Sequence, residues 1–171
     1  MKKLYPNFFL FIVILFGLSC SKEESAENLY ISTTVSIAVM DSFGNDLLNT
    51  NTANYIQSQN IKLFHKIDGE FIEYLSNNLD YAKGFRIYKP YDWVDNSNYI
   101  LCILATRPVN SSDLNPDTYI KWNEFDFDTL QCQYSTSENS VICTKVWFNN
   151  EIVWDINEAK NNDPRWFAVV K

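Results

Sequence analysis

The chain has 171 residues, a formal net charge of −7 and a 16% share of aromatic residues. This acidic balance argues against nucleic acid as a partner, because phosphates require a basic face. The four glycines and five prolines exclude a collagen-like or low-complexity chain. One histidine and the lack of a Cys-x-x-Cys motif argue against a zinc site of the Cys/His type.

The N-terminal residues have the pattern of an export signal. Lys2 and Lys3 precede the apolar run 8–16, and small residues follow before Cys20. The run is shorter than the roughly 20 residues that a membrane-spanning helix needs. It therefore predicts a cleaved signal over residues 1–19. Cleavage would leave 152 residues with a net charge of −9, because the signal carries two lysines and no acidic residue.

The segment that ends at Cys20 resembles the lipobox of bacterial lipoproteins, in which the cysteine is diacylated and becomes the first mature residue. Gly17 occupies a place that is usually aliphatic, and this relaxation is similar to that of Bacteroidetes lipoproteins. The resemblance implies that lipid chains are the contact with the membrane, since two acyl chains make a durable anchor. The alternative is an ordinary secretory signal that leaves Cys20 as a free thiol.

An acidic tether is predicted over residues 20–28. Its stretch 21–25 is similar to the signal that sends Bacteroidetes lipoproteins to the outer face of the outer membrane. The resemblance implies a lipid-anchored, surface-exposed protein of the cell outer membrane. The periplasmic face is the alternative, because solvated acidic linkers are common.

The remaining residues, 29–171, have the pattern of one domain made of short strands. Apolar and small residues alternate in the first segment, and the pair Asp68-Gly69 predicts a hairpin turn between two β-rich runs. The segment 99–105 is almost continuously apolar, which predicts a central strand buried on both faces. The segments with strand character are 31–40, 61–67, 70–75, 85–88, 99–105, 119–122, 129–134, 141–148, 151–154 and 166–170.

Short strands with frequent turns and no helical stripe predict an all-β fold, a single antiparallel β-sandwich. A small closed barrel is the alternative, because the number of strands does not decide closure. The chain resembles small Bacteroidetes lipoproteins that carry one immunoglobulin-like or transthyretin-like β-sandwich behind the lipid. Besides the signal, segments 35–45 and 145–153 carry this resemblance. It implies no catalytic residues.

Three cysteines follow Cys20. Cys132 and Cys143 flank a predicted turn at 136–139, so they are candidates for a disulfide between adjacent strands. A loop this short would make the bond contribute about 3 kcal/mol of stability in the chain-entropy model. The alternative is that they are free thiols, which behave as small hydrophobic residues. Cys102 lies in the apolar segment 99–105 and is expected to be buried.

Aromatic residues supply the candidate ligand surface, which gathers around the polar loop 90–98. Exposed aromatic faces stack on sugar rings and provide rigid contact area for protein partners. Trp122 and Trp147 lie in strand segments and are expected in the core instead. The residues of the candidate surface are Tyr88, Tyr91, Trp93 and Tyr99.

Acidic residues offer a weaker, catalytic alternative. Glu124, Asp126 and Asp128 alternate along one segment, and paired acids can hydrolyse glycosides. A charged strand edge is the favoured interpretation, because charge discourages edge-to-edge pairing. The sequence therefore predicts a binding module with no catalytic activity, cofactor or metal. Its expected role is an accessory protein of a surface or outer-membrane assembly that binds an envelope protein, and the alternative is a glycan-binding surface lipoprotein.

Overall fold

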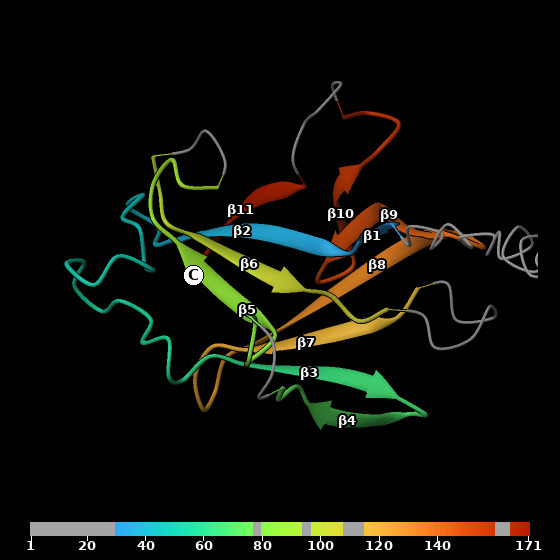
Figure 1. The fold of residues 1–171 in the computed structure, drawn as a ribbon. Coiled ribbons are helices and arrows are strands. Elements are labelled where there is room, and N and C mark those ends of the chain that lie inside the picture. Colours follow the sequence, from blue (N-terminus) through green and yellow to red (C-terminus); the bar gives the residue numbers. More distant parts are fainter. Residues whose placement is uncertain (1–29, 77–79, 94–96, 108–114, 160–164) are drawn as a thin grey trace, which may run out of the picture.

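The computed structural model describes residues 30–76, 80–93, 97–107, 115–159 and 165–171. The predicted signal, Cys20 and the tether lie outside the described residues, as does part of loop 90–98. Within the described ranges the chain is all-β (Figure 1). No helix in these ranges has the length and apolar character needed to cross a membrane. The strands are β1 (Tyr30–Ser32), β2 (Thr34–Met40), β3 (Lys62–Ile67), β4 (Glu70–Glu73), β5 (Phe85–Tyr88), β6 (Ile100–Leu104), β7 (Asp117–Lys121), β8 (Phe127–Ser137), β9 (Ser140–Phe148), β10 (Glu151–Asp155) and β11 (Trp166–Val170).

The strands form two sheets. The seven-stranded sheet has the order β1-β9-β8-β7-β3-β4, with β10 also paired to β9, and the four-stranded sheet has the order β11-β2-β6-β5. Most neighbours are antiparallel, but β1 runs parallel to β9 and β11 runs parallel to β2. Both sheets are therefore mixed, and the prediction of a purely antiparallel arrangement is wrong at these two pairs.

One extended segment, residues 30–40, contributes a strand to each sheet. β1 and β2 follow each other with only Thr33 between them, yet they belong to different sheets (Figure 1). The Arg165 guanidinium holds this crossing by donating to the Ser32 and Thr34 carbonyls at 2.9 and 3.0 Å. At the other end of the chain, β11 returns along β2 in the same direction. Such pairings between distant segments leave no local pattern in the sequence.

A single hydrophobic cluster takes side chains from both sheets. Alternating residues of β2 point into it, and β3, β7, β8 and β9 supply the opposite side. β6 lies between β2 and β5, and four consecutive residues from Ile100 are buried, which confirms the predicted two-faced burial. Trp122 is fully buried as expected, but the expectation for Trp147 is wrong. That ring is only half-buried, and the Lys145 ammonium lies 5.8 Å from its centroid.

Two hairpin turns follow from their residue types, and the turn at Asp68-Gly69 confirms the expectation drawn from the sequence. Asp68 and Gly69 have φ values of 51° and 87° between β3 and β4. Asn149 and Asn150 have φ values of 49° and 70° between β9 and β10. Glycine and asparagine tolerate this left-handed conformation better than other residues do, so these pairs place tight turns.

The candidate disulfide is not formed in the structure, where Cys132 and Cys143 are free and buried thiols, which is the alternative drawn from the sequence. They lie on adjacent strands but not directly opposite each other. Cys132 faces Val146, while Cys143 faces Tyr134. An irregularity in the register between Gln133 and Tyr134 produces this offset. The two side chains are nevertheless close enough to form a hydrogen bond with each other, so they pack as a pair of buried thiols.

Candidate functional site

Small side chains lie on the outer face of the four-stranded sheet. Ser36 and Ala38 on β2 and Cys102 on β6 are buried, although they do not point into the shared core. Their burial means that larger groups cover them. Trp166, which stands opposite Ser36 on β11, packs against Ala38 and Ile100. This face is therefore a sheet of small residues covered by aromatic rings.

Tyr88 and Trp93 form the central part of this cover. Their rings are stacked, with centroids 4.8 Å apart and an interplanar angle of 22°. The Trp93 indole N–H donates to the Ser36 hydroxyl at 3.0 Å, which fixes the ring over the sheet. Trp93 nevertheless remains 45% exposed. The Arg86 guanidinium carbon lies 5.1 Å from the Tyr88 centroid and adds a cation to the stack.

A partly buried hydrogen bond from Tyr81 supports the stacked ring of Tyr88. The hydroxyl groups of Tyr88 and Tyr81 are 3.0 Å apart, and the Tyr81 hydroxyl also donates to the Cys102 sulfur at 3.7 Å. Burial raises the pKa of Tyr81 well above its usual range, so this hydroxyl stays protonated. Sequence reasoning missed Tyr81 and Arg86. The position of Arg86 two residues before Tyr88 on a strand was a usable signal, because such residues share a face.

Tyr91 and Tyr99, the other two residues of the candidate surface, differ in their exposure. Tyr91 is 68% exposed and has a φ of 66°, a rare conformation for a bulky residue. Tyr99 packs against the shared core, and its backbone N–H donates to Asp46 at 2.6 Å. The structure thus brings Tyr88 and Trp93 together and places Tyr91 at the surface two residues before Trp93. Tyr99 lies on the opposite face of the sheet.

Two of the three acidic residues in segment 124–128 form contacts within the fold. Asp128 is buried and accepts the Trp122 indole N–H at 2.6 Å. The Lys171 ammonium binds the carboxylates of both Asp126 and Asp128, while Glu124 is exposed. Two of the three acids therefore share one cation instead of facing a cleft as a pair. In the part of the chain that the structure describes, no three His, Cys, Asp or Glu side chains are grouped to hold a metal ion.

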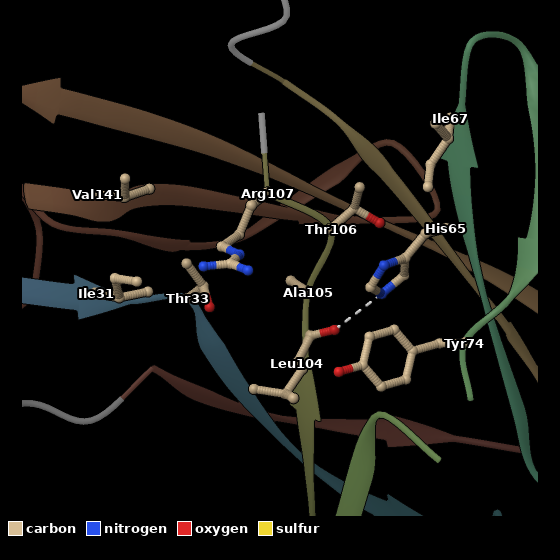
Figure 2. Close-up of a pocket in the computed structure, with 10 residues that line it drawn as sticks. All are labelled: Ile31, Thr33, His65, Ile67, Tyr74, Leu104, Ala105, Thr106, Arg107 and Val141. Atoms are coloured by element: carbon tan, nitrogen blue, oxygen red, sulfur yellow. Dashed lines mark hydrogen bonds between the residues drawn. The ribbon is translucent and has the colours of Figure 1, made fainter. Parts of the chain in front are cut away.

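A cavity of about 480 Å³ lies among β1, β3, β6 and β9 (Figure 2). His65 lines it, and its Nε2 donates to the Leu104 carbonyl at 3.2 Å. The Tyr74 ring lies 4.9 Å from the His65 ring, centroid to centroid. Burial lowers the pKa of His65, and the nearby charge of Arg107 adds to this. No sequence pattern indicated this cavity, because its walls come from five separate segments.

Comparison with protein-family models, with curated proteins and with solved structures finds no match in any of the three. Function is therefore inferred from the residues of the chain itself. Binding geometry is present in at least two places among the described residues. One is the aromatic surface, defined as Tyr88, Tyr91 and Trp93, and the other is the cavity.

Proposed function

We propose that this protein is a lipid-anchored, non-catalytic binding module of the cell envelope that contacts its partner through the aromatic surface. Its role is that of an accessory protein in a surface or outer-membrane assembly. The lipobox-like segment before Cys20 supports the anchor. Two sheets that share one core support a β-sandwich body of the immunoglobulin-like or transthyretin-like type.

The stacked and half-exposed indole of Trp93 is the observation that carries the proposal. Leaving this much aromatic surface in water forgoes burial that would stabilise the fold. The Ser36 hydrogen bond and the stack on Tyr88 already restrict the ring. A partner that covers it therefore causes little further loss of side-chain entropy, which favours binding.

Residue types favour an envelope protein as the partner. Tyrosine, tryptophan and arginine dominate the binding energy of protein interfaces, and Tyr88, Trp93 and Arg86 supply one of each. A glycan is the second candidate, because the same exposed indole can stack on a sugar ring. The two candidates share the surface and differ in the chemistry of the bound molecule.

Photo-crosslinking in the native cell tests the surface. A photoreactive amino acid replaces Tyr91 in one strain and Phe125 in another, the latter being 89% exposed in the connection between β7 and β8 of the other sheet. We expect a discrete adduct from position 91 that disappears when Trp93→Ala is added. Mass spectrometry of the digested adduct identifies a protein partner by foreign peptides crosslinked to position 91, while carbohydrate attached to the peptide with position 91 identifies a glycan. Identical adducts from positions 91 and 125 would contradict the proposal.

Cys20→Ala tests the anchor. We expect the variant to leave the membrane fraction, and the native protein to carry acyl chains on an N-terminal Cys20 by mass spectrometry. Protease treatment of intact cells then separates the outer face from the periplasmic face. A variant that remains in the membrane fraction, or a native protein that retains residues 1–19, would show that the anchor is wrong.

A further inference from the structure

The cavity between the sheets has mainly apolar walls. Ile31, Ile67, Leu104 and Val141 are among the residues that line it. Its volume of about 480 Å³ falls in the range of small-molecule sites, roughly 300 to 1,000 Å³. Figure 2 shows these residues around the cavity, and they come from both sheets. An apolar body of small-molecule size therefore fits this space.

Arg107 provides the charge. Its guanidinium lies beside Thr33 and points into the cavity in Figure 2. Four lysines of the described chain are paired with carboxylates, but Arg107 has no ion pair among the described residues. The described residues that line the cavity include no Asp or Glu. Arg107 is exposed and has no ion pair among the described residues, so a cation beside this apolar space attracts an anion.

Two further polar groups face the same space. The Tyr74 hydroxyl points into the cavity in Figure 2. His65 uses Nε2–H for the Leu104 carbonyl, so Nδ1 of the neutral ring is left as an acceptor. The cavity therefore combines the positive charge of Arg107, the hydroxyl groups of Tyr74, Thr33 and Thr106, and mainly apolar walls. A neutral or cationic ligand would form no ion pair with Arg107.

We propose that this cavity binds an amphipathic carboxylate of the fatty-acid type, with its carboxylate on Arg107 and its chain between the apolar walls. One guanidinium matches a single carboxylate, because its fork of donors fits two oxygens at once. The single positive charge of Arg107 also matches the single negative charge of a monocarboxylate. This inference does not depend on the aromatic surface, which lies on the outer face of the four-stranded sheet.

Titration with octanoate, decanoate and decanol tests the proposal. The full chain carrying Cys20→Ser is used, so that no attached lipid competes. His65 is the single histidine, so its ring resonances report occupancy of this cavity in NMR spectra. Burying one methylene is worth a factor of about four in affinity, so decanoate should bind about 15-fold more tightly than octanoate. Decanol should bind at least tenfold more weakly than decanoate.

Arg107→Gln should lower the decanoate affinity at least tenfold and leave decanol binding unchanged, which also shows that the variant is folded. Lys83→Gln is the control, because this exposed lysine removes the same charge away from the cavity. Equal decanoate affinity in the Arg107 variant would overturn the proposal. So would equal affinities for decanoate and decanol, or binding that leaves the His65 resonances unmoved.

Discussion

Trp122 donates its indole N–H to the carboxylate of Asp128 at 2.6 Å, and both side chains are buried between the sheets. The other Asp128 oxygen accepts from the Asn149 amide at 2.7 Å. The Lys171 ammonium binds Asp128 and lies 5.2 Å from the Trp122 ring centroid. Lys171 follows β11 in one sheet and Asp128 lies on β8 in the other, so this cluster connects the two sheets by polar contacts.

Asp128→Ala should destabilise the fold strongly. The substitution leaves the Trp122 indole N–H, the Asn149 amide and the Lys171 ammonium without this buried acceptor. We expect a loss of about 3 kcal/mol in the free energy of unfolding, measured by urea denaturation. Asp126→Ala is the matched control, because Asp126 binds the same lysine from a more exposed position and should cost about 1 kcal/mol or less. Equal losses in the two variants would show that burial of Asp128 is unimportant.

Gly84→Ala should destabilise the fold more than Gly69→Ala. Both glycines have positive φ, 78° and 87°, so both variants carry a backbone cost of about 1–2 kcal/mol. A Cβ at Gly84 would lie 2.9 Å from Tyr74 Cδ1 and 3.1 Å from Leu63 Cδ1, whereas Gly69 faces open space. Overpacking adds about 1–3 kcal/mol at Gly84. Denaturation midpoints that shift equally would rule out the close approach.

The turns and most strands were predictable because their causes are local. Asp68-Gly69 and Asn149-Asn150 set the backbone angles of two hairpins by their own chemistry. The two parallel pairs were not predictable, because each joins segments more than 100 residues apart. The change of sheet at Thr33 was equally hidden, since an alternating pattern continues through this residue.

The candidate site was only partly predictable for a similar reason. Tyr88 and Trp93 are five residues apart, so a loop could bring them together, and it does. Tyr99 enters a strand that is buried on both faces, and there apolar character does not reveal which face a residue takes. The cavity depends on Ile31 and Arg107, which are far apart in sequence, so only the folded chain brings them together.

Thiol labelling tests the state of Cys132 and Cys143. Cys102, Cys132 and Cys143 are all buried, so they should resist a maleimide reagent in the native protein and react after unfolding. The hydrogen bond to Cys143, together with burial, raises the pKa of Cys132, which further slows its reaction. We expect mass spectrometry to find all three modified after unfolding in urea without a reductant. Modification of Cys102 alone, with a mass two hydrogens lower, would instead show a disulfide.

His65 should make stability fall as the pH falls below neutrality. Burial lowers its pKa in the folded state below the value of about 6.5 that it has when unfolded, so the unfolded chain takes up a proton first. The stabilising contribution is complete above about pH 6.5 and is lost as the pH falls toward the folded pKa.

Two measurements check this expectation. An NMR titration of the single histidine should give a pKa below 6.5. Urea denaturation at about pH 7.5 and about pH 5.5 should show a larger loss of stability for the native sequence than for His65→Gln, which does not titrate in this range. The glutamine amide is also a hydrogen-bond donor for the Leu104 carbonyl, so the comparison measures the effect of protonating His65 on stability. Parallel pH profiles for the two proteins, or a histidine pKa at or above 6.5, would contradict the buried, neutral ring.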